Sequence, residues 1–160
     1  MSAQKPLDDV KVIELGQLIA GPFAGKIFAE FGAEVIKIEP PAADGKPGGD
    51  PLRQWRKLHN GTSLWWYAQA RNKKSVTINL RLAEGQDIVR KLARDADIVI
   101  ENFRPGTMEK WGLGYDRLAA ENPGYEQRGT ADTRSLIRSP PTTCMASMSM
   151  ARWRDPTTTE

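Results

Sequence analysis

The chain has 160 residues, of which 39% are hydrophobic and 27% charged, so it is long enough to form one domain with a buried core. Its net charge of +3 is too small to predict a nucleic-acid partner, and no apolar run reaches the length of a membrane span. The single cysteine, Cys144, excludes an internal disulfide, and the single histidine, His59, gives no histidine cluster for a metal. We therefore expect a cytoplasmic protein that binds no metal, no nucleic acid and no membrane.

The first elements that the sequence predicts are a strand, a helix and a second strand. Val10–Leu15 is a short run rich in β-branched residues, as expected for a strand covered on both faces. Gly21-Pro22 then breaks the chain, with Pro22 as a first helical residue, and Gly32 stands where a helix stop belongs. Glu34–Glu39 is the second strand, which completes a parallel βαβ unit. The predicted helix has large apolar residues at helical spacing: Phe23, Ile27, Phe28 and Phe31.

The pattern continues after a loop at residues 40–60 that is dense in Pro, Gly and Asp. Ser75–Leu80 alternates as a strand does, and Asp97–Phe103 is another strand of the parallel type. Between them, Leu82–Ala96 is an amphipathic helix. Its inward residues are predicted to be Ile88, Val89 and Leu92. The fold class is therefore α/β, with a mostly parallel sheet and helices on both faces.

The composition changes at Tyr125. Residues 125–160 are rich in Ser, Thr, Arg and Pro, and the only Leu and Ile among them are Leu136 and Ile137. Such a segment buries too little apolar area to offset the entropy of ordering it, so we expect disorder or loose association. We divide the chain into an α/β portion, residues 1–124, and this tail. The abrupt change also indicates a truncated or frame-shifted product, a hypothesis that sequencing the coding region around Tyr125 tests.

The turn at Gly21-Pro22 is the first candidate for ligand binding. A glycine there lets the backbone approach a ligand closely, and the N-terminus of the helix offers free N–H groups to an anion. The alternative is an ordinary turn between strand and helix. The dinucleotide fingerprint G-x-G-x-x-G is absent, although Glu39 lies where a ribose-binding acid would stand.

A cluster of cations is the second candidate. Arg71–Ser75 holds three cations beside the aromatic residues 65–67, and Arg81 follows the next strand. These groups have the chemistry to bind phosphate and the face of an adenine ring. The alternative is a solvated loop whose charges face water.

The end of the strand Asp97–Phe103 is the third candidate, because α/β folds bind ligands at the carboxyl ends of parallel strands. Asn102, Phe103 and Arg104 supply an amide, a ring and a fixed charge there, and Lys110 follows shortly after. The alternative is that Asn102 satisfies the backbone of its own loop. No nucleophile stands out beside these groups, because His59 lies in a polar loop and Cys144 lies in the tail with no histidine after it. The residues also show no pair of carboxylates at catalytic spacing.

Several segments, taken in order, resemble the N-terminal part of the class III coenzyme A transferases, the CaiB/BaiF family. They are VKVIELGQLIAGPFAGKIFAEFGAEVIKIEPP, GGDPLRQW, SLWWYAQARNKKSVTINL and VIENFRPGTMEKWGLGYDRLAAENPG. The resemblance spans Leu7–Gly124 and implies a Rossmann-like fold in an interlocked homodimer. It also implies transfer of coenzyme A from an acyl-CoA to a carboxylic acid; family members include formyl-CoA transferase and the 2-methylacyl-CoA racemases.

The resemblance also implies which residues bind coenzyme A. Backbone contacts fall on Ile19 and Ala20, and cationic phosphate partners fall on Arg81 and Lys110. One departure is Pro40, which stands where some members have an arginine. The remaining implied contacts come from two strand ends and are Ile78, Asn79, Leu80, Asn102, Phe103 and Arg104.

The catalytic aspartate of the family lies downstream of the segment that matches Asn122–Gly124. The later aspartates here, Asp132 and Asp155, lack the expected surroundings, so we assign no catalytic residue. We expect a truncated member of the family that is inactive alone and retains affinity for coenzyme A. Two alternatives are a non-catalytic fragment that pairs with a full-length paralogue through its sheet edge, and a small nucleotide-binding Rossmann domain.

Overall fold

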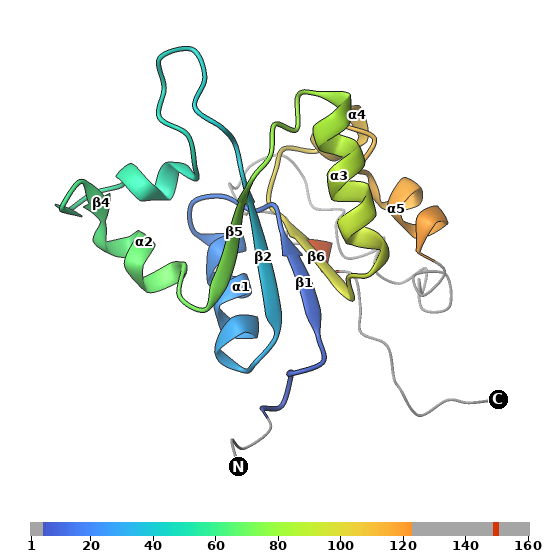
Figure 1. The fold of residues 1–160 in the computed structure, drawn as a ribbon, viewed down its shortest axis with the longest axis horizontal. Helices are drawn as coiled ribbons and strands as arrows, with labels where there is room; N and C mark the ends of the chain where they lie inside the picture. The colour runs from blue at the N-terminus through green and yellow to red at the C-terminus, as the bar shows by residue number, and fades with distance from the viewer. Residues whose placement is uncertain (1–4, 123–148, 151–160) are drawn as a thin grey trace, which may run out of the picture.

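The computed structural model describes residues 5–122 and the backbone of the short strand Ser149–Met150. These residues form a parallel sheet with helices packed against it (Figure 1). In chain order the elements are β1 (Lys11–Glu14), α1 (Ala20–Glu30), β2 (Glu34–Glu39), the 3-10 helix η1 (Pro51–Gln54), β3 (Leu58–His59), β4 (Thr62–Ser63), α2 (Leu64–Gln69), β5 (Lys73–Thr77), α3 (Ala83–Arg94), β6 (Ile98–Glu101), α4 (Thr107–Lys110), α5 (Tyr115–Glu121) and β7 (Ser149–Met150).

The main sheet has the strand order β5-β2-β1-β6-β7. All pairs among the first four are parallel, and β7 pairs antiparallel with β6. The register sets Ile13 of β1 between Ile36 of β2 and Val99 of β6. Because the parallel strands run in one direction, their carboxyl ends lie at one edge of the sheet, at the top in Figure 1. The predicted α/β class with a mostly parallel sheet is confirmed.

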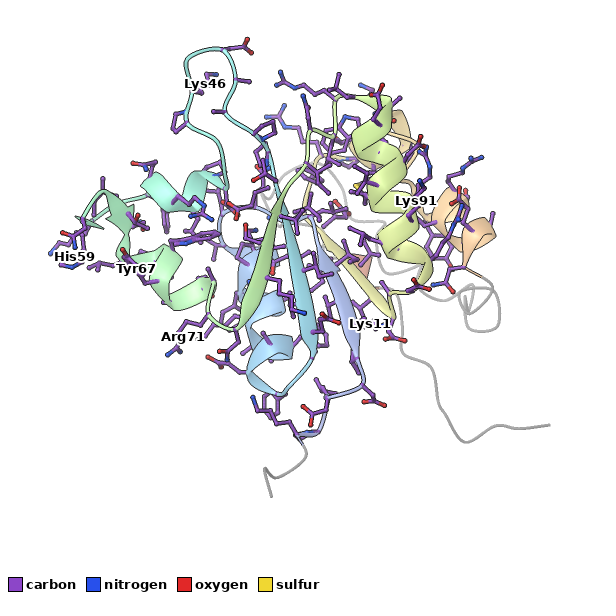
Figure 2. All side chains as sticks on the ribbon, in the orientation of Figure 1. Lys11, Lys46, His59, Tyr67, Arg71 and Lys91 are labelled. Atoms are coloured by element: carbon purple, nitrogen blue, oxygen red, sulfur yellow. The ribbon has the colours of Figure 1, made fainter. Side chains whose placement is uncertain are left out.

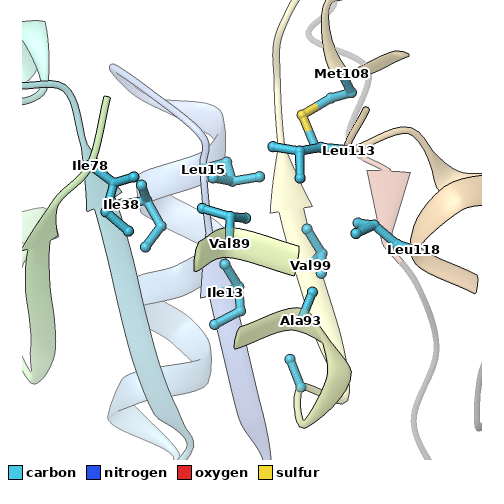
Figure 3. Packing of buried hydrophobic residues seen from close by; sticks show 11 residues of the cluster. Ile13, Leu15, Ile38, Ile78, Val89, Ala93, Val99, Met108, Leu113 and Leu118 are labelled. Carbon is cyan, nitrogen blue, oxygen red and sulfur yellow. The ribbon is translucent and has the colours of Figure 1, made fainter. Parts of the chain in front are cut away.

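The larger core lies between the sheet and the helices α3, α4 and α5. Val89 of α3 is fully buried there against residues of β1 and β6, as Figure 3 shows. The predicted inward position of Val89 is confirmed, and Leu92 packs at the margin of the same cluster. The prediction for Ile88 is wrong, because its side chain is 47% exposed. The buried stripe of α3 follows Gly85, Val89 and Ala93, at a spacing of four, and Ile88 lies to the side of that stripe.

The opposite face of the sheet is covered by α1 through small residues. Ala24 and Ala29 are buried against Val12 and Val35, and of the large residues in the predicted helical pattern only Phe28 packs against this core. Phe23 is 51% exposed and Phe31 is 53% exposed. Small residues allow the axis of α1 to lie close to the strands. The spacing of the large residues therefore predicted the helix correctly without predicting the face that is buried.

The boundaries of α1 differ slightly from the prediction at one end and agree at the other. The helix begins at Ala20, so Pro22 is its third residue rather than its first. Proline is tolerated there because no intrahelical bond is made by the N–H groups of the first turn. At the other end Gly32 has a φ of +112°, which confirms it as the helix stop.

The strand β5 begins two residues before the predicted start at Ser75 and ends before the predicted end at Leu80. Lys73 and Lys74 pair with Val35 and Ile36 of β2, so the polar residues belong to the ladder rather than to a loop. Similarly, β6 ends at Glu101 instead of Phe103. Polar strand ends carry a weak periodic signal, and only the partner strand fixes their pairing.

The predicted loop at 40–60 contains some short structure. It includes η1 and leads into the β3–β4 hairpin, in which Asn60 and Gly61 both have positive φ, as a tight hairpin turn requires. Figure 2 shows His59 and Tyr67 in the part of the structure formed by η1, β3, β4 and α2, away from the core of the sheet. The predicted tail lies outside the described residues, apart from the backbone of Ser149–Met150.

Candidate functional site

The loops that follow β1, β2, β5 and β6 all leave the sheet at its carboxyl edge, which we call the strand-end edge. It comprises residues 15–19, 40–50, 78–82 and 102–106. In Figure 2, Lys46 marks the tip of the loop after β2, and Lys11 marks the opposite end of β1. The fold therefore brings the predicted binding residues after β1, β5 and β6 to one edge, although the chain separates them widely.

Both polar atoms of the Asn102 side-chain amide form hydrogen bonds with the loop after β1. Its Oδ1 accepts a hydrogen bond from the backbone N–H of Gln17 at 2.8 Å, and its Nδ2 donates to the Gln17 carbonyl at 2.8 Å. Of the two alternatives for this residue, the side chain does satisfy backbone groups, but not those of its own loop. The partner belongs to a neighbouring loop, so Asn102 ties two loops of the strand-end edge together.

The other predicted groups after β6 differ in exposure. Phe103 packs edge-on against Trp111, with ring centroids 5.1 Å apart and planes at 83°. Arg104 and Lys110 are exposed. Among the residues that the structure describes, neither of these two cations forms an ion pair. They are available to an anionic ligand.

The segment after β5 is mostly engaged with the protein. The side chain of Ile78 is buried in the core, and Leu80 packs at the margin of that core. The Oδ1 of Asn79 accepts from the backbone N–H of Arg81 at 3.0 Å, which forms a local turn. Arg81 lies in solvent with only a 3.9 Å contact to the equally exposed Asp44. In this segment, the cation of Arg81 is therefore the group with freedom to bind a ligand.

The turn between β1 and α1 was expected to let a ligand approach Gly21 and to offer the N–H groups of the helix N-terminus to an anion. A Cβ built on Gly21 would lie 2.6 Å from the Cα of Gly16, so this glycine serves the close packing of two backbone segments rather than approach to a ligand. The helix N-terminus fits the predicted anion site better. No side chain caps α1 at Ile19, so its first N–H groups keep their capacity to bind an anion.

The cation cluster at 71–75 contains one cation that is buried in the protein and two whose side chains lie largely in solvent. Lys73 is buried, and its Nζ lies 2.6 Å from Oε2 of Glu14 and donates to the carbonyl of Pro22. Lys74 pairs with Glu34 and Arg71 pairs with Glu30. These side chains tie β5 and the end of α2 to α1 and β2. The alternative of charges that face water describes Arg71 and Lys74, whose side chains are 62% and 70% exposed, but not the buried Lys73. Burial lowers the pKa of Lys73, although the charge of Glu14 opposes that effect.

A buried ion cluster beneath the strand-end edge was missed by the sequence analysis. The Nζ of Lys37 lies 2.8 Å from Oε1 of Glu14 and 2.8 Å from Oδ2 of Asp50, and it donates to the Gly16 carbonyl at 2.7 Å. All three side chains are at most 1% exposed. A signal existed in the sequence, because a lysine within a strand covered on both faces requires a buried partner. The identity of that partner did not follow from the pattern.

Glu39 is not available to bind a ribose, so that interpretation is wrong. Its carboxylate accepts from Nε and Nη2 of Arg53 at 2.7 and 2.8 Å, from Ser75 Oγ at 2.5 Å and from the N–H of Asp50 at 2.7 Å. The guanidinium of Arg53 in turn lies 3.8 Å from the centroid of Trp66. Burial alone would raise the pKa of Glu39, but the bonds from Arg53, Ser75 and Asp50 outweigh it and lower the pKa to about 2.

This pKa predicts how stability depends on pH. The carboxyl of Glu39 has a pKa of about 2 in the folded state against an ordinary 4.5, so its stabilisation is complete above pH 4.5 and is lost as the pH falls toward 2. We expect the difference in unfolding free energy between the wild type and E39Q to shrink by roughly 3 kcal/mol over that range. Urea unfolding at several pH values measures it. A difference that stays constant with pH would contradict the expectation.

The described residues offer neither a metal site nor a membrane-spanning helix. Within residues 5–122, no group of three or more His, Cys, Asp or Glu side chains is arranged to hold a metal ion. No helix in the described part of the chain has the length and apolar character needed to cross a membrane. Glu101, at the end of β6, has its pKa raised by burial, although the N–H of Phe103 bonds to it. Cys144, Asp132 and Asp155 lie outside the described residues.

The fold and the edge together define a class of protein: an α/β domain of Rossmann type that presents backbone N–H groups and free cations at the carboxyl ends of its strands. Comparison with known families then gives the identity of that class here. Residues 7–125 match the family described as CoA-transferase family III, and the chain belongs to this family. The predicted family and its predicted span are thereby confirmed.

Individual relatives agree with this assignment. A succinyl-CoA–D-citramalate CoA-transferase of Chloroflexus aurantiacus is 58% identical over 128 residues, which cover 78% of this chain and 31% of the relative. The alpha subunit of a succinyl-CoA–L-malate CoA-transferase from the same organism is 50% identical over 123 residues, covering 76% of this chain and 28% of the subunit.

Solved structures give the same picture. The crystal structure of a CaiB/BaiF family protein from Brucella suis is 40% identical and superposes with a TM-score of 0.67, covering 76% of this chain and 32% of that one. The chain thus spans about a third of the length of the relatives it matches.

Proposed function

We propose that this chain binds coenzyme A at the strand-end edge. The observation that carries the proposal is the presence of two exposed cations without ion-pair partners in the described part of the chain, Arg104 and Lys110, on the loop and helix that follow β6. The uncapped N-terminus of α1 favours a phosphate group nearby. Membership of a CoA-transferase family supplies the ligand whose phosphates fit these groups.

The proposed contacts follow the family resemblance and the exposure of each group. The backbone at Ile19 and Ala20, the segment 78–81 and the segment 102–104 would line the ligand, with Arg81 and Lys110 near its phosphates. Asn102 and Asn79 would act through the loops they hold, since their side chains already bond to the backbone. In the complete family reaction, the ligand would be an acyl-CoA and the acceptor a carboxylic acid. The relatives named above act on succinyl-CoA.

We propose further that this polypeptide lies in the cytoplasm. We also propose that the purified polypeptide binds coenzyme A without exchanging thioesters. Family chemistry requires a carboxylate that attacks the thioester. Three buried carboxylates lie at or next to the strand-end edge: Glu14 and Asp50 are held by the buried Lys37, and Glu39 is held by the half-buried Arg53. A carboxylate so engaged is a poor nucleophile, because attack would break its ion pair.

Isothermal titration with coenzyme A tests the binding proposal. We expect a measurable heat with the wild type, and at least a tenfold weaker affinity for the R104A/K110A double variant, because one cation that lines the ligand and one near its phosphates are lost. K91A, which removes an exposed lysine of α3 away from this edge, is the matched control. The absence of heat at millimolar ligand would refute the proposal. Thioester exchange by the isolated polypeptide would refute the proposed inactivity.

Association with a second family chain is the other candidate function. β5 is the outer strand of the described sheet, and four of its five residues are exposed, so its edge offers unpaired backbone groups. Two relatives are the alpha and the beta subunit of a succinyl-CoA–L-malate CoA-transferase. Co-expression with a full-length paralogue tests this function, and recovery of the chain as a clean monomer would contradict it.

A small NAD-binding domain is disfavoured by the engagement of Glu39 with Arg53.

A further inference from the structure

The turn between β1 and α1 contains a residue in an unfavourable backbone conformation. Leu18 has a φ of +61°, in the left-handed region that non-glycine residues seldom occupy. Such a conformation persists only where the surrounding structure imposes it, and it is found preferentially at binding and active sites. Leu18 immediately precedes Ile19 and Ala20, the backbone positions where we place coenzyme A. The groups that impose the conformation therefore bear on that site.

Three buried or half-buried side chains hold this turn, and each comes from a different part of the chain. Lys37 of β2 donates to the Gly16 carbonyl at 2.7 Å. Asn102 bonds to both the N–H and the carbonyl of Gln17. Oδ1 of Asp50 accepts from the N–H of Leu18 at 3.0 Å. Of these contacts, the one with Asp50 reaches the left-handed residue itself.

Both carboxylate oxygens and the backbone N–H of Asp50 are held by neighbouring groups. Its Oδ1 also accepts from the N–H of Leu52 at 2.8 Å, which caps η1. Its Oδ2 lies 2.8 Å from the ammonium of Lys37, and its backbone N–H donates to Glu39. The residue is 2% exposed. A carboxylate held in this way cannot follow a moving loop, so it fixes the position of the Leu18 N–H relative to the sheet.

We propose that Asp50 is a positioning residue for the coenzyme A site. By holding the N–H of Leu18, it keeps the turn in the left-handed conformation that directs the backbone of Ile19 and Ala20 and the start of α1 toward the ligand. The proposal rests on the proposed binding of coenzyme A at this edge. It assigns a function to a residue of the Gly- and Pro-rich loop after β2, which touches the turn but not the proposed ligand contacts.

The test compares three variants of the full chain: D50A, D50N and V89A. Val89 is fully buried in the core on the α3 side, so V89A is a control that lowers stability without touching the turn. Two quantities are measured for each variant: the Kd for coenzyme A by titration calorimetry, and the hydrogen exchange of the Leu18 amide relative to amides in β1. For D50A we expect a Kd at least tenfold weaker and selectively faster exchange at Leu18.

D50N separates the role of the oxygen from that of the charge. Its amide oxygen still accepts from Leu18 and Leu52, so we expect a Kd between those of the wild type and D50A, and it carries the test if D50A does not fold. V89A is expected to keep the wild-type Kd and the wild-type exchange at Leu18. A wild-type Kd in D50A, or an equal loss in V89A, would overturn the positioning role while leaving coenzyme A binding intact. No binding by the wild type would instead refute the proposed function itself.

Discussion

Replacing Lys37 with methionine is expected to lower the free energy of unfolding by about 3–5 kcal/mol, the usual cost of removing one partner from a buried ion pair. Methionine fills a similar volume, so the loss would come from charge rather than from a cavity. The variant would leave the Glu14 and Asp50 carboxylates buried with one cation fewer. Of these, Oδ2 of Asp50 has no hydrogen-bond donor among the described residues and depends on the Lys37 charge.

The matched control for this substitution is K74M. Lys74 lies on the neighbouring strand and also pairs with a glutamate, Glu34, but its side chain is 70% exposed. An exposed pair contributes about 1 kcal/mol at most, so K74M should unfold nearly as the wild type does. Urea unfolding followed by circular dichroism measures both variants. If K37M lost no more stability than K74M, the buried cluster would not be the structural element that we describe.

The expected size of this effect also links the stability of the domain to the geometry of the strand-end edge. A small domain has a net stability of about 5–15 kcal/mol, so K37M would remove a large share of it. The same ammonium bonds to the Gly16 carbonyl and neutralises Asp50, which holds Leu18. Loss of Lys37 would therefore loosen the β1–α1 turn as well as destabilise the fold. Stability and the geometry of the site depend here on one side chain.

Local periodicity was sufficient to predict most of the framework. The strand β2 has the predicted bounds Glu34–Glu39, and α3 lies within the predicted range 82–96. These patterns are local, because a strand or helix covered by a core repeats apolar residues at its own period. The family resemblance then implied a Rossmann-like fold, but the strand order β5-β2-β1-β6-β7, which local patterns leave open, was not predicted.

The parts that could not be predicted depend on contacts between distant residues. Lys37 and Lys73 share the partner Glu14, which lies on another strand, so neither ion pair could be predicted from the local pattern. A Cβ on Gly25 would lie 1.9 Å from Oε2 of Glu14, so this glycine leaves room for the same carboxylate. The amide of Asn102 could serve a ligand or a loop equally well until its partner, Gln17, was known. None of these contacts could be predicted before the pairing of the strands in the sheet was known.

Replacing Gly85 with alanine is expected to reverse the ordinary rule for a helical glycine. Gly85 lies inside α3, where alanine is favoured over glycine by about 1 kcal/mol when the side chain meets open space. Here a Cβ would lie 2.1 Å from the carbonyl oxygen of Asn79 and 3.1 Å from Cγ2 of Ile78. Backbone atoms cannot rotate away as a flexible side chain does. We therefore expect G85A to lower the free energy of unfolding by about 1–3 kcal/mol.

The same substitution should reach the proposed site, because Asn79 belongs to the segment 78–81 that follows β5. The Asn79 carbonyl also accepts from the N–H of Leu82, so displacing it would shift Arg81 between the two. We expect the affinity of G85A for coenzyme A to fall more than that of E84A, the exposed neighbouring position, whose stability should change by less than about 0.5 kcal/mol. Urea unfolding and calorimetric titration of the two variants measure both effects. An alanine at position 85 that raised stability would mean that α3 does not lie against Asn79 as closely as described, and the placement of Arg81 at the strand-end edge would fail with it.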